Sequence, residues 1–193
     1  PELVDETIET RITEREFFDF LDKRKDMLEG VVITGGEPTI HGEDLLHFMR
    51  KIKKRGFLVK LDSNGTNPHI LKQAIEERVA DYIAMDMKAP LSKYSQIAAR
   101  PVDTAAIAES IRLLIASPIL YEFRTTVVKG LVSFAEIAEI GREIQGAKRY
   151  FLQKFIPTKI LNPQFRRAVT YTDEEFEEMR KRASNYVNYC GIR

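Results

Sequence analysis

Apolar residues along the chain fall into two alternating patterns. Apolar residues at helical spacing predict six helices, and Ser/Thr-x-x-Glu capping boxes open three of them, at Thr13, Ser133 and Thr172. The first helix is expected to continue past Arg24 and Leu28 and to end at Gly30. Between the helices, short apolar runs rich in β-branched residues predict five strands, at 31–34, 57–61, 80–85, 120–128 and 148–155.

Strict alternation of helices and strands predicts the α/β class, with parallel strands joined by right-handed crossovers. The strands are largely apolar rather than alternating, which is typical of a sheet covered on both faces. The pattern leaves two architectures open, a doubly wound sheet and an open or partial (β/α) barrel. No internal repeat and no Pro/Gly/Ser-rich linker divides the chain, so residues 1–193 are expected to form a single domain.

Composition narrows the class of protein. The 193 residues carry 30 Lys and Arg against 29 Asp and Glu, a net charge of +1, whereas nucleic-acid-binding domains normally have a clear basic excess. No apolar run approaches the roughly 20 residues that span a bilayer, and the acidic first residues do not resemble a signal peptide. The single cysteine, Cys190, excludes an intrachain disulfide and a metal site made of four cysteines of this chain. We therefore expect a cytoplasmic protein without nucleic-acid or membrane partners.

Polar residues gather where the predicted strands end. Each of five clusters follows a different strand or lies late in it: 35–39, 62–66, 86–88, 124–126 and 153–154. Because the carboxyl ends of parallel strands meet at one edge of a sheet, where such folds place their sites, we expect these clusters to converge. We call this edge of the sheet the mouth.

Two of these clusters also have a purely structural interpretation. The glycine pair at 35–36 suits a turn with positive φ, and the dipeptide at 64–65 is a good turn sequence as well. Glu37, beside the glycines, is less easily explained by a turn. An acid there suits an ammonium or hydroxyl ligand.

Two carboxylates, Asp62 and Asp86, are expected to lie close together at the mouth. They repel each other unless a cation or a protonated ligand lies between them. Lys88 and Arg124 offer a structural alternative, because either could pair with the two acids. The sequence does not decide between a bound cation and an ion pair.

Four segments carry a family resemblance. They read V-V-I-T-G-G-E-P-T at 31–39, L-D-S-N-G-T-N-P at 61–68, A-M-D-M-K-A-P at 84–90 and Y-E-F-R-T-T-V-V at 121–128. Together they resemble the radical S-adenosylmethionine activating enzymes, most closely those of anaerobic ribonucleoside-triphosphate reductases, next to those of pyruvate formate-lyase. The resemblance covers nearly the whole chain and implies a partial (β/α)6-type TIM barrel.

The family binds a [4Fe–4S] cluster through a Cys-x3-Cys-x2-Cys motif, which is absent from the 193 residues. Relatives commonly continue after that motif with His-Asn-Pro-Glu-Leu, and this chain begins Pro1-Glu2-Leu3. The resemblance therefore implies that the chain starts after the first strand and the cluster loop of the barrel. We expect no cluster on this chain alone and weak S-adenosylmethionine binding at best.

The resemblance also implies a cofactor-binding role for twelve residues: Gly35, Gly36, Glu37, Pro38, Asp62, Ser63, Asn64, Asp86, Lys88, Arg124, Leu152 and Phe155. Residues 35–37 match the segment that holds the methionine ammonium of S-adenosylmethionine. Asp62 and Asp86 match positions that bind a monovalent cation beside the cofactor's carboxylate. Lys88 and Arg124 match basic residues that face cofactor and substrate, which makes them the candidates for a catalytic role. The end of the last predicted strand matches the part that lines the adenine.

The resemblance implies that the complete protein cleaves S-adenosylmethionine reductively to a 5′-deoxyadenosyl radical, which takes a hydrogen atom from a glycine of an anaerobic ribonucleotide reductase. A flavodoxin- or ferredoxin-type protein is the electron donor that such an enzyme implies, and the 193 residues alone are expected to be inactive. Two alternatives stay open. One is a radical S-adenosylmethionine enzyme with another substrate, such as the pyruvate formate-lyase activating type. The other is a cofactor-binding module that has no cluster and is not an enzyme.

Overall fold

The computed structural model describes residues 12–97, 101–156 and 170–193. Its centre is one six-stranded parallel sheet in the order β1-β2-β3-β4-β5-β6. The strands are β1 (Gly30–Ile33), β2 (Leu58–Ser63), β3 (Tyr82–Asp86), β4 (Leu120–Val127), β5 (Tyr150–Lys154) and β6 (Cys190–Ile192). The helices are α1 (Glu14–Asp22), α2 (Glu43–Lys54), α3 (Pro68–Glu76), α4 (Tyr94–Ile97), α5 (Thr104–Ala116), α6 (Phe134–Glu143) and α7 (Asp173–Ala183), with 3₁₀ turns η1 (Pro38–His41) and η2 (Leu91–Lys93).

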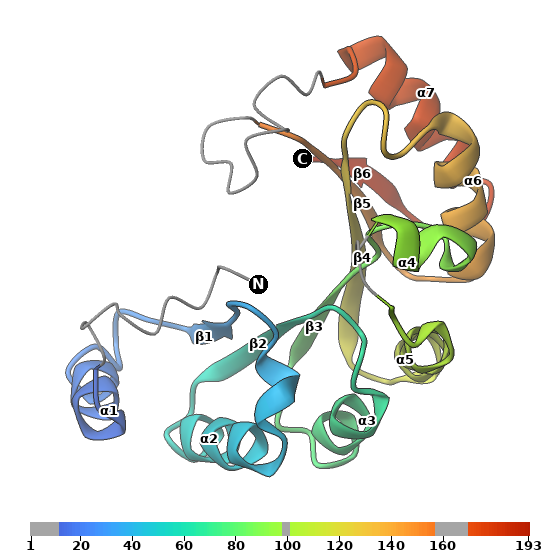
Figure 1. The fold of residues 1–193 in the computed structure, drawn as a ribbon. Coiled ribbons are helices and arrows are strands. Elements are labelled where there is room, and N and C mark those ends of the chain that lie inside the picture. Colours follow the sequence, from blue (N-terminus) through green and yellow to red (C-terminus); the bar gives the residue numbers. More distant parts are fainter. Residues whose placement is uncertain (1–11, 98–100, 157–169) are drawn as a thin grey trace.

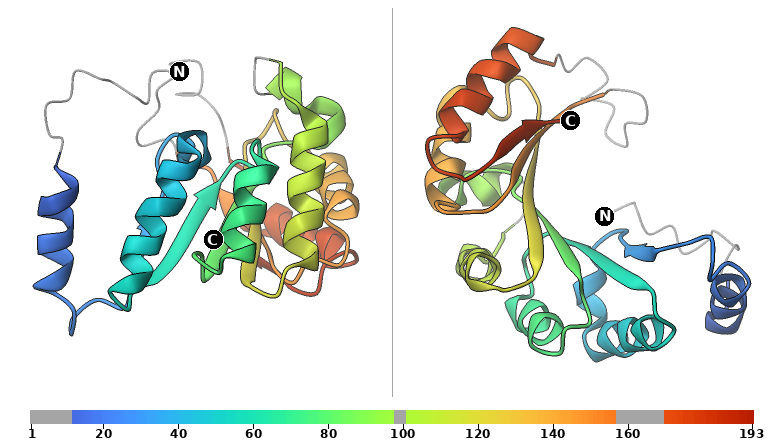
Figure 2. Two further views of the ribbon diagram at one scale, coloured as in Figure 1. Left: turned by 90° about the horizontal axis from the view of Figure 1, so that it is seen from below. Right: turned by 180° about the vertical axis from the view of Figure 1, so that it is seen from behind.

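The sheet curves into an open arc with the helices on its convex side (Figure 1). The views from below and from behind show the same arrangement, in which none of the helices of the described residues lies on the concave side (Figure 2). A partial barrel is therefore confirmed, and the doubly wound alternative is wrong. The expectation that both faces are covered is wrong as well, because Leu58 and Leu120 on the concave side are 52% and 56% exposed. No helix of the described residues is long and apolar enough to cross a bilayer.

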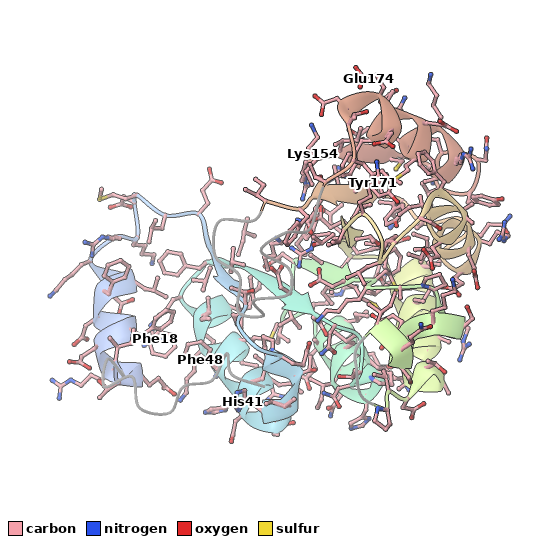
Figure 3. All side chains as sticks on the ribbon, turned by 45° about the horizontal axis from the view of Figure 1, so that its top comes forward. Phe18, His41, Phe48, Lys154, Tyr171 and Glu174 are labelled. Carbon is pink, nitrogen blue, oxygen red and sulfur yellow. The ribbon has the colours of Figure 1, made fainter. Side chains whose placement is uncertain are left out.

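The convex face of the sheet forms the core with the helices. In β2, Val59 and Leu61 are fully buried, whereas Lys60 and Asp62 point to the concave side. At the β1 end of the sheet, α1 packs on α2 through the rings of Phe17, Phe18 and Phe48. Figure 3 labels Phe18 and Phe48. The alternation along each strand thus separates an apolar core from a concave face that carries charged side chains.

The three predicted capping boxes are confirmed, since Thr13, Ser133 and Thr172 each accept a hydrogen bond from the backbone three residues on. Three predictions of secondary structure are wrong. The described residues form seven α-helices rather than six, because the short helix α4 was not predicted. The first helix ends at Asp22, well before Gly30. The sheet has six strands rather than five, because a short strand at the end of the chain, β6, pairs with β5.

Candidate cofactor-binding site

The loops after β1 and β2 form one wall of the mouth. Gly35 has a φ of 140°, a backbone region that favours glycine, and a Cβ there would meet no atom within 4 Å. The backbone of this loop is therefore open to a ligand. A small cavity of about 50 Å³ is lined by Thr34, Gly35, Gly36, Glu37, Pro38, Asp62, Ser63, Asn64, Asp86, Lys88 and Arg124. The structure thus brings together ten of the twelve residues predicted to bind a cofactor.

Glu37 fastens the loop after β1 to the loop after β2. Its Oε1 accepts hydrogen bonds from Ser63 Oγ at 2.9 Å and from the Thr39 backbone amide at 3.2 Å. Its Oε2 accepts one from the backbone amide of Asn64 at 2.6 Å. The carboxylate therefore caps η1 and fixes both loops, and a direct contact between it and a ligand stays a prediction.

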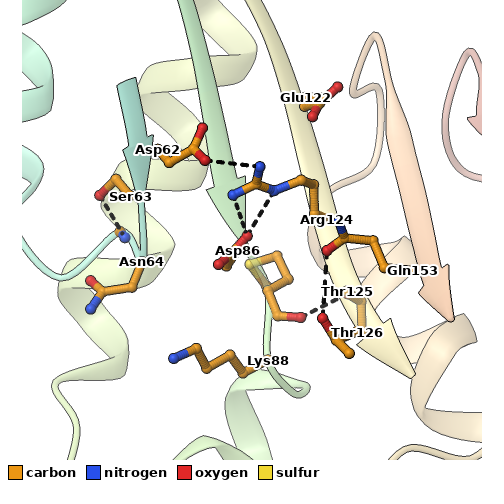
Figure 4. A network of polar contacts seen from close by, with 12 residues as sticks. Asp62, Ser63, Asn64, Asp86, Lys88, Glu122, Arg124, Thr125, Thr126 and Gln153 are labelled. Atoms are coloured by element: carbon orange, nitrogen blue, oxygen red, sulfur yellow. Dashed lines mark hydrogen bonds and ion pairs between the residues drawn. The ribbon is translucent and has the colours of Figure 1, made fainter. Parts of the chain in front are cut away.

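Arg124 lies between the two aspartates of the mouth (Figure 4). Its Nε donates to Asp86 Oδ1 at 2.8 Å, and its Nη1 donates to Asp62 Oδ2 at 3.2 Å. The strand register explains the arrangement, because Asp86 and Arg124 are directly paired residues of β3 and β4. The structural alternative of an ion pair is therefore confirmed for Arg124, and a monovalent cation beside the two acids stays a prediction.

Burial and neighbouring charges shift the pKa values of Asp86 and Arg124 in opposite directions within the triad Asp62, Arg124 and Asp86. Burial raises the pKa of Asp86, and the Arg124 guanidinium offsets only part of that increase. Burial alone would lower the pKa of Arg124, but Asp86 and Asp62 together raise it. Asp62 Oδ1 is buried and accepts no hydrogen bond from the described residues, although the Lys60 ammonium lies 3.2 Å away. A buried oxygen without a donor is a place where a ligand or an ion would be stabilised.

Lys88 is exposed at the mouth and, within the part of the chain that the structure describes, forms no ion pair. It lines the small cavity and also a second cavity of about 200 Å³, which lies between the ends of β3 and β4 and includes Ile97, Val128 and Leu131. The two cavities adjoin, because Asp86, Lys88 and Arg124 line both. The mouth therefore offers a polar end beside an apolar one.

The prediction for Leu152 needs a correction. Its side chain is fully buried in the core, on the convex side of β5, so that it does not face the mouth. On β5 the concave positions are instead Phe151 and Gln153. Phe155 follows β5 and is partly buried, but neither it nor Leu152 lines the two cavities at the mouth.

A second charged network lies on the concave face, farther from the mouth. The Glu122 side chain, which is 2% exposed, accepts two hydrogen bonds from Arg193, at 2.8 and 2.9 Å, and one from the Tyr82 hydroxyl at 2.7 Å. Burial raises the pKa of Glu122, but these hydrogen bonds outweigh it and leave the pKa below its ordinary value. This network was not predicted, because in the sequence Glu122 is an isolated acid in an apolar strand.

Cys190 does not suit an iron–sulfur cluster. It is buried on β6, and burial raises the pKa of its thiol to about 12, whereas cluster ligands are thiolates. The chain contains only this one cysteine. The residues of this chain therefore do not fit a [4Fe–4S] cluster. The open glycine loop, Asp62 Oδ1 without a hydrogen-bond donor, and Lys88 without an ion pair among the described residues fit a small zwitterionic cofactor.

Comparison with known proteins decides the family. The model of the radical SAM superfamily matches residues 6–149. The chain belongs to this superfamily. Over 169 residues, covering 86% of this chain and 70% of the relative, it is 29% identical to the Methanocaldococcus jannaschii protein named "Putative glycyl-radical enzyme activating enzyme MJ1227".

Two solved structures share the fold of this chain. A domain of pyruvate-formate lyase-activating enzyme from Bacteroides vulgatus superposes with a TM-score of 0.68 and 16% identity, over 85% of this chain and 98% of that one. A radical SAM methyltransferase from Sphaerobacter thermophilus superposes with a TM-score of 0.71 and 16% identity, over 93% of this chain and 55% of that one. At such identities the similarity establishes the fold alone.

Proposed function

We propose that this chain binds S-adenosylmethionine at the mouth and forms part of an activating enzyme for a glycyl-radical enzyme, specifically an anaerobic ribonucleotide reductase. The observation that carries the proposal is the convergence at one mouth of the open Gly35 loop, the Asp62–Arg124–Asp86 triad and the unpaired Lys88. Membership of the radical SAM superfamily and the similarity to the M. jannaschii protein support it.

Different residues of the mouth bind different groups of S-adenosylmethionine. The backbone carbonyls at 35–36 receive the methionine ammonium, on a loop that the Glu37 carboxylate holds in place. Lys88 receives the methionine carboxylate, because Arg124 is already paired with two acids. The apolar cavity beside Lys88 excludes water from the rest of the ligand.

Bound S-adenosylmethionine would supply the radical chemistry, and the protein supplies binding and orientation. No step through a cluster is assigned to these residues, since a single buried cysteine cannot hold one. The iron–sulfur cluster, the electron donor of flavodoxin or ferredoxin type and the partner reductase belong to the activity of the complete enzyme.

A titration of the ¹⁵N-labelled chain with S-adenosylmethionine, followed by NMR, tests the binding site. We expect shifts at amides 35–37, 63–64 and 86–88, and weaker binding in Lys88→Met. Lys154→Met is the matched control. Although Lys154 was predicted to lie at the mouth, its ammonium pairs with Asp173 and it lines neither cavity there. Shifts confined to other parts of the sheet, or equal losses in the two variants, contradict the assignment.

The partner is tested with two peptides, one from the glycine loop of an anaerobic ribonucleotide reductase and one from pyruvate formate-lyase. Preferential binding of the first supports the reductase, and preferential binding of the second supports the other activating type. The third candidate is a cofactor-binding module without a cluster. The gene sequence upstream of Pro1 decides that question, since three cysteines at family spacing there would exclude the module.

A further inference from the structure

The segment Asp86-Met87-Lys88 runs past the end of β3 and carries two of the charged groups of the mouth. Its backbone is held by the last hydrogen bond of the pairing between β3 and β4 and by hydrogen bonds to side chains. The Met87 amide donates to the Arg124 carbonyl at 2.7 Å, and the Met87 carbonyl accepts from Thr125 Oγ1 at 2.7 Å. Thr125 Oγ1 in turn accepts from the buried Tyr150 hydroxyl at 2.8 Å.

The side chain of Tyr94 also holds the backbone of this segment. The Tyr94 hydroxyl donates to the Asp86 carbonyl at 3.2 Å and accepts from the Lys88 amide, also at 3.2 Å. Tyr94 is the first residue of α4 and is 3% exposed, so its hydroxyl reaches the segment from the convex side. One buried hydroxyl therefore bridges the carbonyl of one residue and the amide two positions later.

This bridge determines where the side chains point. Residues two positions apart in an extended segment share a face, and Asp86 and Lys88 both line the two cavities of the mouth. Met87, between them, is fully buried in the core on the other face. A rotation of the peptide units at 86–88 would move the Lys88 ammonium away from the cavities, and the Tyr94 hydroxyl opposes that rotation at both of its ends.

We infer that Tyr94 is a positioning residue for ligand binding, acting through the backbone of Asp86 and Lys88 without touching the ligand. This inference rests on the proposed S-adenosylmethionine site. Burial raises the pKa of the Tyr94 hydroxyl to about 12, so it keeps its proton at neutral pH and can donate to the carbonyl. Both contacts are to backbone atoms, so the bridge needs a hydroxyl on this ring, and its effect on the ligand passes through the position of the Lys88 side chain.

The test compares Tyr94→Phe with Tyr121→Phe in the ¹⁵N-labelled chain. Tyr121 is the matched control, because it is 1% exposed and its hydroxyl also accepts one backbone hydrogen bond, at 3.1 Å from the amide of Lys148, two residues before β5. Each variant loses one buried hydroxyl, so we expect similar decreases in the urea midpoint. Hydrogen exchange of the Lys88 amide should become about tenfold faster in Tyr94→Phe alone, since that amide loses its acceptor.

Affinity for S-adenosylmethionine separates positioning from stability. We expect the Kd to rise about fivefold in Tyr94→Phe and to stay unchanged in Tyr121→Phe, the loss of about one hydrogen bond. The double variant with Lys88→Met should bind no more weakly than Lys88→Met alone, because Tyr94 acts through Lys88. Equal affinities in the two tyrosine variants, or losses that multiply in the double variant, overturn the inference.

Failure of the proposed function gives a different result. If the unmodified chain does not bind S-adenosylmethionine, the proposed site is wrong, whatever the variants do. Exchange at Lys88 then decides the bridge by itself: faster exchange in Tyr94→Phe supports it, and unchanged exchange refutes it.

Discussion

Replacing Arg124 with methionine should destabilise the protein far more than removing an arginine from its surface. The guanidinium is 12% exposed and joins Asp62, which is 17% exposed, to Asp86, which is 40% exposed. Arg124→Met keeps most of the aliphatic length and leaves Asp62 and Asp86 facing each other, with the Lys60 ammonium, 3.2 Å from Asp62 Oδ1, on the Asp62 side alone. Removing one partner of a buried pair costs about 3–5 kcal/mol, because it leaves an uncompensated buried charge.

Partial exposure of Asp86 lets water replace some of the lost contacts, so we expect about 3 kcal/mol, the lower end of that range. For a domain of this size the loss lowers the Tm by roughly 6–12 °C. Arg50→Met is the matched control, since Arg50 also bridges two acids, Glu43 and Glu77, but at the surface. Its loss should cost no more than about 1 kcal/mol.

Urea unfolding of both variants between pH 4 and pH 8 measures the effect. The deficit of Arg124→Met should shrink toward pH 4, because burial raises the pKa of Asp86 and protonation of Asp86 removes its repulsion by Asp62. Asp62→Asn should restore part of the stability at pH 7. A deficit below about 1 kcal/mol, or one that does not change with pH, would refute the reasoning. Repeating the measurement in KCl and in choline chloride tests the predicted monovalent cation. A gain specific to KCl in the variant alone would mean that the guanidinium occupies the place of that cation.

Three further outcomes follow from the same contacts. Glu37→Ala should lower the unfolding free energy by about 2–3 kcal/mol in urea titrations, against a few tenths for Glu139→Ala, because the first acid fastens two loops and the second accepts one exposed hydrogen bond. Cys190 should resist a thiol reagent at pH 8 in the native protein and react once urea unfolds it, since its pKa is about 12; rapid native modification would contradict its burial. Burial raises the pKa of Asp86 above 3.8 in the folded state, so the folded protein binds more protons and the contribution of Asp86 to stability falls as pH rises through its folded pKa. Relative to Asp86→Asn, the unmodified protein should therefore lose stability as pH rises from about 4, and a gain would reverse the assigned direction.

The sequence predicts the elements with strong local signals and fails where the signal lies in tertiary contacts. The short strand β6 has glycine at its centre and only three residues, too few for a period-two pattern. It pairs with β5 where Gly191 leaves room for a ring, since a Cβ there would lie 2.8 Å from Phe151. The first helix ends at Asp22 although the apolar spacing continues beyond it. Arg24 lies after the helix, with its guanidinium carbon 3.8 Å from the centre of the Phe20 ring.

The candidate site shows the same division. Its location followed from the rule that parallel strands end at one edge, and ten of the predicted residues do line one cavity there. The partner of Arg124 did not follow, because only the register that places it opposite Asp86 decides between an ion pair and a free cation. The side of β5 on which Leu152 lies was equally undetermined, since the strand is apolar on both faces. Tyr94 gave no signal at all, as its function depends on two backbone atoms of another segment.

The order of the strands has a consequence for how the protein opens. Every strand pairs only with its neighbours in sequence, so the sheet can fray from either edge without disturbing the far side. Of the strands that build the mouth, β1 should separate from the sheet more easily than β4. β1 has four residues and a single described neighbour, whereas β4 has eight residues and two neighbours. A ligand that contacts both the Gly35 loop and Lys88 would connect β1, at the edge of the sheet, with β3 across β2. It would therefore oppose separation of β1 from the sheet. Binding of a ligand at the mouth and unfolding of the β1 edge are therefore linked. On binding, protection of the backbone amides from hydrogen exchange should increase more in β1 than in β4.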